Sequence, residues 1–294
     1  MKKTTRTTLL ILSLAVIAVM STTAFAQRGG TKTDGKMIYH DGPVMQGTSN
    51  IYLIWYGNWS GDDTPVILSD LASGIGSSLY FLINTTYPDS SGGAPSGGLV
   101  FTGAVSDQYS QGPTLSVEAI QQVVWGRINS GVLPLDTRAI YLVIGSADVT
   151  DIRPDGSTFC TPGTTPHHGV GTYEGAFFKY GYLGAASRCP TSAAPHFVDA
   201  NGNQLPTPNG NFNADGMASS FAHLLNVIIT NPINTGWFDR HGLENAAKCM
   251  GKFGTTYITE NGARANSRFA ARNFLIQQNW INERRGRCAM SIAV

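Results

Sequence analysis

The chain is poor in charged residues, and those that it has are balanced in sign. Only 13% of its 294 residues are Asp, Glu, Lys or Arg, with 20 basic residues against 19 acidic ones. A protein that binds nucleic acid or an anionic membrane surface carries a patch with a clear excess of basic groups. We therefore expect no nucleic-acid partner.

The sequence also has few cysteines and no closely spaced pair of them. Its four cysteines are Cys160, Cys189, Cys249 and Cys288, and none belongs to a C-x-x-C motif. This absence argues against a zinc knuckle and against a thioredoxin-type redox site. An even number of cysteines is typical of disulfide bonds in an oxidising compartment, and four cysteines allow three pairings.

Only one long hydrophobic run is present, and it lies near the start of the chain. It spans residues 9–20, follows a basic start, and precedes the small-residue sequence Ala24-Phe25-Ala26. These three parts are the pattern of a cleavable signal peptide, and the run is shorter than the ~20 residues of a membrane-spanning helix. We predict a signal peptide over residues 1–26 and a secreted or cell-envelope protein with no membrane span in the mature chain.

The rest of the chain is predicted to be one domain after a short arm. Residues 27–36 are polar and glycine-rich, as in a flexible arm, and residues 37–294 are assigned to a single domain. Continuous apolar runs at 51–56 and 139–144 predict strands that are buried on both faces.

Helical spacing of apolar residues occurs in three places. It predicts helices over 65–83 and over 116–129, the second with Ser116 as its N-cap, and a last one over 215–229. The order of strand, helix, helix and strand indicates an α/β fold with a small central mixed sheet and flanking helices. Residues 150–210 are dense in Gly and Pro and are predicted to be a long, disulfide-tied loop.

Several sequence blocks, spread over nearly the whole predicted mature chain, carry a family resemblance. They are, in chain order, Tyr39–Val44, Ile51–Trp59, Tyr109–Gly112, Ile140–Val143, Pro208–Gly210 with Asp215–Met217, Asn231-Pro232 with Trp237, and Arg272–Gln277 with Trp280. Together they resemble the exordium or phosphate-induced protein family of secreted proteins, which is best known from plant cell walls. The second block is the most specific of them.

The predicted helix at 215–229 bears on whether the protein is an enzyme. The family commonly carries His-Glu-Leu-x-Glu before Asn-Pro, which is similar to a zincin helix, where the Glu beside the histidine polarises a metal-bound water. Alignment on Asn231-Pro232 places His223 on the family histidine, but Leu224 and Val227 stand where the two carboxylates would be. Because aliphatic groups neither bind zinc nor accept a proton, the resemblance implies a degenerate zincin-like arrangement without catalysis.

An alternative is a secreted zinc-dependent, metallopeptidase-like hydrolase with an atypical ligand set. His167 follows Cys160 at a spacing similar to the family's Cys-x6-His, and Glu244 retains the Glu of a family Glu-x-x-Asp-x-Cys. A weak or vestigial metal site of His167, His223 and Glu244 is therefore conceivable. The alternative to such a metal site is that the adjacent His167 and His168 are loop histidines with ordinary surface roles. We expect no cofactor, with zinc as the alternative.

The resemblance also implies a disulfide pairing. Family members tend to show Cys-x3-Cys twice in this region, and the second cysteine of each pair is replaced here by Thr164 and Ala193. If those two family cysteines are mutual partners, the remaining bridges are Cys160–Cys189 and Cys249–Cys288.

Taken with the secretion signal, the resemblance implies a non-catalytic protein that binds a cell-wall glycan or an extracellular protein. Trp59 and Trp237 are candidates for stacking on sugar rings, although aromatic side chains more often pack in cores.

Overall fold

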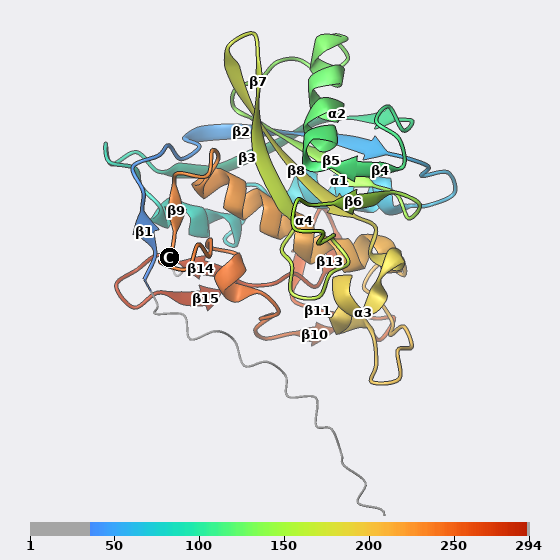
Figure 1. The fold of residues 1–294 in the computed structure, drawn as a ribbon. Coiled ribbons are helices and arrows are strands. Elements are labelled where there is room, and N and C mark those ends of the chain that lie inside the picture. Colours follow the sequence, from blue (N-terminus) through green and yellow to red (C-terminus); the bar gives the residue numbers. More distant parts are fainter. Residues whose placement is uncertain (1–35, 293–294) are drawn as a thin grey trace, which may run out of the picture. The chain divides into compact units, whose positions relative to one another are not determined.

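A five-stranded mixed sheet lies at the centre of the fold (Figure 1). The computed structural model describes residues 36–292. The predicted signal peptide and the predicted arm, apart from Lys36, lie outside the described residues. Within residues 36–292, no helix is long and apolar enough to cross a bilayer.

The order of the strands in the sheet is β3-β2-β5-β8-β7. The strands are β2 (Gly47–Tyr56), β3 (Pro95–Asp107), β5 (Ala139–Gly145), β7 (His167–Tyr173) and β8 (Ala176–Gly184). Strands β3, β2, β5 and β8 run parallel to one another, and only the edge strand β7 is antiparallel to its neighbour β8. The predicted α/β class with a central mixed sheet is therefore confirmed.

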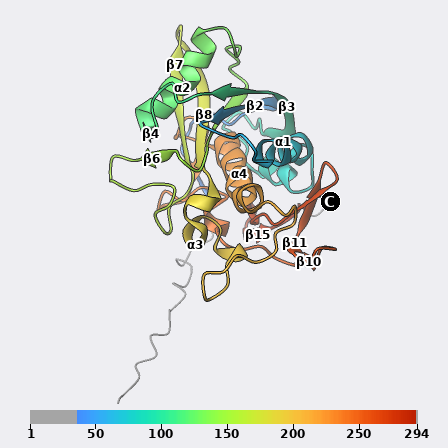
Figure 2. The same cartoon turned by 90° about the vertical axis from the view of Figure 1, so that its right-hand side faces the viewer.

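Helices cover both faces of the sheet. The helix α2 (Val117–Asn129) lies on one face, while α1 (Thr64–Ile75) and α4 (Phe212–Thr230) lie together on the other (Figures 1 and 2). The predicted helix over 116–129 is confirmed, because the Ser116 Oγ accepts a hydrogen bond from the Ala119 amide at 3.1 Å and caps α2.

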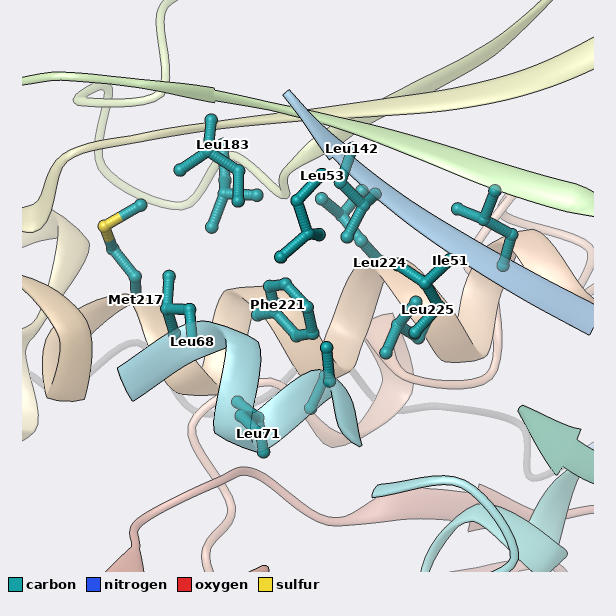
Figure 3. Packing of buried hydrophobic residues seen from close by; sticks show 14 of the residues in the cluster. Ile51, Leu53, Leu68, Leu71, Leu142, Leu183, Met217, Phe221, Leu224 and Leu225 are labelled. Atoms are coloured by element: carbon teal, nitrogen blue, oxygen red, sulfur yellow. The ribbon is translucent and has the colours of Figure 1, made fainter. Parts of the chain in front are cut away.

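Helix α4 is buried on almost every side, as expected for a helix that is apolar around its whole circumference. Its Phe221, Leu224 and Leu225 point toward Ile51 and Leu142 of the sheet, and α1 covers its other flank (Figure 3). Burial of one such aliphatic or aromatic side chain stabilises the fold by about 1.5–3 kcal/mol. The interior position of α4 thus follows from its composition.

The helix predicted over 65–83 is wrong in its second half. Helix α1 ends at Ile75, and a 3₁₀ helix, η1 (Phe81–Thr86), follows separately. The chain leaves the helix at Gly76, where an added Cβ would lie only 2.2 Å from the Leu99 carbonyl oxygen of β3. Close passage of the backbone beneath β3, rather than apolar spacing, therefore ends the helix.

Strand β3 has no apolar run that would predict it. It occupies one edge of the sheet, and exposed residues alternate with buried or partly buried ones along most of its length. An edge strand needs apolar side chains mainly on its inner face, and the Ser and Gly residues at its start look like a loop.

The long loop predicted over 150–210 is also wrong. It contains a hairpin of β7 and β8, which turns at Glu174 and Gly175 in the left-handed region. The charged Lys179 and the glycine at 181 interrupt the apolar run of β8, so the spacing of apolar residues alone does not indicate a strand there. The disulfide Cys160–Cys189 brackets this hairpin rather than an unstructured loop.

Short elements complete the fold. The remaining helices are η2 (Ala186–Arg188), α3 (Pro190–Ala193), η3 (Pro195–Phe197) and η4 (Ala247–Cys249), and the remaining strand pairs are β1 (Ile38–Tyr39) with β9 (Trp237–Phe238), β4 (Thr114–Ser116) with β6 (Thr150–Ile152), β10 (Tyr257–Ile258) with β11 (Arg264–Ala265), β12 (Ser267–Phe269) with β13 (Arg272–Phe274), and β14 (Asn279–Ile281) with β15 (Arg287–Ala289). The second disulfide, Cys249–Cys288, joins η4 to β15. The two bridges are the pairs that the family resemblance implies.

Candidate functional site

His223 lies in the middle of α4 and is only 2% exposed. Its Nδ1 lies 3.2 Å from the Nε2 of Gln277, which also donates to the Ala246 carbonyl. Because an amide nitrogen only donates, Nδ1 accepts and the neutral ring carries its proton on Nε2. Burial lowers the pKa of His223 to about 4, so the imidazole is uncharged at neutral pH.

The two helix positions that would carry carboxylates in the family motif belong to the core. Leu224 and Val227 are both completely buried, and Leu224 packs toward Leu142 of the sheet (Figure 3). A carboxylate at either position would have to be buried among aliphatic side chains, at a cost of several kcal/mol. The replacements are therefore part of the hydrophobic packing of this protein.

Glu244 is held by two neighbours on different elements. Its carboxylate accepts from the His168 ring, with Nε2 3.0 and 3.1 Å from the two oxygens, and from the Asn231 amide at 2.7 Å. Burial raises the pKa of this carboxyl, but His168 and Asn231 together bring it below its ordinary value. Glu244 is therefore ionised and already paired.

The histidine that reaches Glu244 is His168, and its neighbour His167 lies on the opposite face of the sheet. Successive side chains in a strand point to opposite faces. His167 shares a face with Tyr173, whose ring contacts Trp125 of α2 at 5.9 Å, and burial lowers the pKa of His167 to about 4. The structure therefore brings His168 and Glu244 together, and it places His167 on the α2 side.

The donors around α4 do not fit a zinc site. A zinc site requires about three protein ligands around one point. Among residues 36–292, no group of three His, Cys, Asp or Glu side chains is placed to hold a metal. His223 faces an amide nitrogen, and both oxygens of Glu244 face His168 or Asn231. We derive no catalytic step that uses a metal here.

A cleft of about 310 Å³ opens beside His223, and we call it the α4 cleft. Its polar lining includes His196, Ser220, His223 and Gln277, and Phe253 adds an aromatic wall. Burial lowers the pKa of His196 to about 4, and its ring lies 4.7 Å from that of Phe253. None of the described residues that line this cleft is Asp, Glu, Lys or Arg. The α4 cleft thus offers uncharged hydrogen-bonding groups beside aromatic rings.

Both disulfides anchor walls of the α4 cleft. One wall is formed by residues that follow Cys160 and Cys189 closely in the chain, namely Gly163, Thr164, Pro166, Ser192, Ala193 and Pro195. Another contains Met250, Gly251 and Phe253, which follow Cys249. Sequence analysis singled out His223 but not Ser220, His196, Phe253 or Gln277 as site residues, because these polar and aromatic groups form no local motif.

The two candidate tryptophans lie in different surroundings. Trp59 packs edge-on against Trp55, with the ring centroids 5.6 Å apart. Trp237 contacts Tyr39 and Tyr87, donates its indole N–H to the Pro88 carbonyl, and lines a separate hollow of about 750 Å³. Trp237 therefore borders a hollow at the surface, whereas Trp59 packs on another tryptophan.

Comparisons with known proteins identify similar sequences. Residues 37–288 match the model of the phosphate-induced protein 1 conserved region. Protein EXORDIUM-like 5 of Arabidopsis thaliana is 31% identical over 218 residues, which are 68% of this chain and 59% of that relative, so the match spans less than two thirds of it. Protein EXORDIUM-like 3 of the same plant is 27% identical over 276 residues, 83% of this chain and 80% of the relative. No solved structure matches the chain.

Proposed function

The chain belongs to the phosphate-induced protein 1 family, and we propose that it is a secreted, non-catalytic member that binds a cell-wall glycan. The single observation that carries the proposal is the uncharged, partly aromatic lining of the α4 cleft. Secretion is supported by the basic start, apolar run and Ala24-Phe25-Ala26 at the beginning of the chain, and by the two disulfides.

The absence of catalysis is inferred from the chemistry around His223. No carboxylate adjoins it in the helix, and Glu244 is already engaged by His168 and Asn231. Without a free base, proton transfer loses a contribution of about 10²–10⁴ in rate. We interpret α4 beneath the sheet as a degenerate zincin-like arrangement, in which the histidine remains and its catalytic partners do not.

A neutral glycan suits the chemistry of the α4 cleft. Sugars present many hydroxyl groups and no charge, and each hydroxyl can both donate and accept. The Ser220 hydroxyl, the Gln277 amide and the two neutral imidazoles, His196 and His223, supply matching groups, while Phe253 offers an apolar ring face. Ligand sites typically combine such apolar walls with a few polar groups that fix orientation.

The glycan proposal predicts that the protein is retained by a neutral wall polymer through the α4 cleft. Two neutral polymers, insoluble cellulose and immobilised xyloglucan, and the charged polymer peptidoglycan would be incubated with the mature protein, and the bound fraction measured against concentration. Phe253→Ala should weaken binding by about fivefold, since an aromatic contact supplies ~1 kcal/mol. Ser220→Ala should weaken it less.

Trp237→Ala and Trp59→Ala serve as controls in this assay, because neither tryptophan lines the α4 cleft. Loss of binding in Trp237→Ala alone would move the glycan site to the hollow beside Trp237. Retention by none of the polymers would contradict the proposal and would favour a protein partner or a purely structural role.

The alternative of an atypical zinc hydrolase predicts a different metal content. We expect the purified mature protein to contain no stoichiometric zinc, because Leu224 and Val227 cannot replace oxygen ligands. Elemental analysis of the wild-type protein and of His223→Ala tests this expectation. About one zinc per chain that disappears in His223→Ala would support the hydrolase instead.

A further inference from the structure

A further hollow, larger than the α4 cleft, lies at the amino ends of β2, β5 and β8. Its volume is about 420 Å³, and it shares no lining residue with the α4 cleft. We call it the amino-end pocket. It is lined by the segment before β2 (Pro43, Val44, Met45, Gln46), by Ser49 of β2, by Thr137 and Arg138, by the β7–β8 turn and the start of β8 (Gly175, Ala176, Phe177, Lys179), and by Pro232 and Ile233. Its size is within the range of small-molecule sites.

One part of the amino-end pocket is apolar. Val44 and Met45 are nearly buried, and the backbone N–H of Met45 is anchored to the Ile229 carbonyl at the end of α4. Phe177, by contrast, is 52% exposed. An exposed phenyl ring beside a nearly buried aliphatic wall is a surface on which an apolar ligand gains contact area.

The amino-end pocket also carries two cations and no carboxylate among the described residues that line it. These are Arg138, which is exposed, and Lys179, which is partly buried and donates to the Thr137 carbonyl. Neither is joined to a carboxylate by an ion pair within residues 36–292. The nearby Asp136 carboxylate accepts from the Asn50 amide at 2.6 Å and from the Arg138 backbone N–H at 2.8 Å, and it acts on Lys179 only as a neighbouring charge.

An independent observation comes from Ser49. This residue is completely buried and lines the amino-end pocket, and its Oγ has no hydrogen-bond partner. A buried hydroxyl without a partner costs about 1–3 kcal/mol, so buried polar groups are rarely left unpaired. A ligand oxygen in the pocket would supply the missing partner.

We propose that the amino-end pocket binds a small organic acid with an apolar body. Its carboxylate lies between Arg138 and Lys179 within reach of the Ser49 hydroxyl, and its apolar part packs on Met45 and Phe177. Charge and apolar surface are both required, because a carboxylate without an apolar body leaves Phe177 uncovered and an uncharged body leaves two cations unpaired. This site is separate from the glycan site and does not depend on it.

The test is a titration of the ¹⁵N-labelled mature protein with 4-phenylbutyrate, followed by the amide chemical shifts. We expect saturable shifts at Met45, Gly175 and Ala176, with a dissociation constant of about 1 mM or tighter. Two control probes should each bind about tenfold more weakly. The alcohol 4-phenylbutanol lacks the negative charge, and inorganic phosphate lacks the apolar body.

Variants locate the charge recognition. Arg138→Gln and Lys179→Met should each weaken the binding of 4-phenylbutyrate by about tenfold. Glu174 lies in the β7–β8 turn next to Gly175 but does not line the pocket, so Glu174→Gln should have no effect. Because Arg138 is exposed, its variant keeps the fold, and the unchanged remainder of the spectrum verifies this. Equal affinity for the acid and the alcohol, shifts elsewhere, or no saturable shift would overturn the proposal.

Discussion

Replacement of Lys248 by Met should lower the free energy of unfolding by about 3–5 kcal/mol. The Lys248 ammonium lies 2.8 Å from an Asp239 oxygen, and both side chains are fully buried. Removal of the cation leaves the Asp239 carboxylate charged in the interior without its partner, and such an uncompensated charge costs far more than the ion pair itself contributes. Chemical denaturation of both proteins at pH 7 measures the difference.

The exposed pair Arg287–Glu283 supplies the matched control. Its side chains are 52% and 51% exposed, so Arg287→Met should change the free energy of unfolding by only about 0–1 kcal/mol. A change of similar size in Lys248→Met would show that the buried pair is not a structural requirement.

The pH dependence provides a second measure of the same pair. Burial raises the pKa of Asp239, but Lys248 and the backbone N–H groups of Leu243 and His241 outweigh it and hold this pKa below its ordinary value. A depressed pKa stabilises the fold above the unfolded-state pKa, and this contribution is lost as pH falls through the folded-state value. The wild-type protein should therefore lose stability as the pH falls below the ordinary aspartate pKa of about 4, and Lys248→Met should lose less, because protonation relieves its unpaired carboxylate.

Removal of either disulfide should cost about 2–5 kcal/mol. The bridges close segments with sequence separations of 29 and 39. Loop-closure entropy alone corresponds to about 3.6 and about 3.9 kcal/mol for these lengths. Double variants, Cys160→Ala with Cys189→Ala and Cys249→Ala with Cys288→Ala, leave no unpaired thiol and can be compared with the oxidised wild type in urea.

The disulfide variants also link stability to binding. Each bridge lies next to a wall of the α4 cleft, so both double variants should bind the wall polymer more weakly than the wild type at a temperature where they remain folded. Binding of 4-phenylbutyrate in the amino-end pocket should change little, since no wall of that pocket follows a cysteine closely. Unchanged stability in both variants would contradict the predicted contribution of the bridges.

Part of the fold follows from local sequence. Continuous apolar runs identified β2 and β5 because the central strands of a parallel sheet are buried on both faces. The Ser116 cap and helical spacing identified α2. Local sequence did not predict the edge strand β3 or the β7–β8 hairpin, because their Gly, Ser and Lys residues are tolerated only through pairing with other strands.

The candidate site shows the same limit at the level of single residues. His167 and His168 are adjacent in the chain, and only the pairing of β7 with β8 determines which of them faces α4. A shift of one residue in a strand moves a side chain to the opposite face. Sequence reasoning therefore included His167 in the candidate set, while the structure places His168 beside Glu244.

The sequence alone determined the family, the α/β class and the aliphatic residues Leu224 and Val227 near His223 in the helix, since these depend only on which residues occur in which order. Tertiary structure decided that Gln277 faces His223, that Asn231 and His168 engage Glu244, and that Ser49, Arg138 and Lys179 line one pocket. Each of these groupings joins residues from separate segments, and long-range packing, which no local pattern encodes, brings them together.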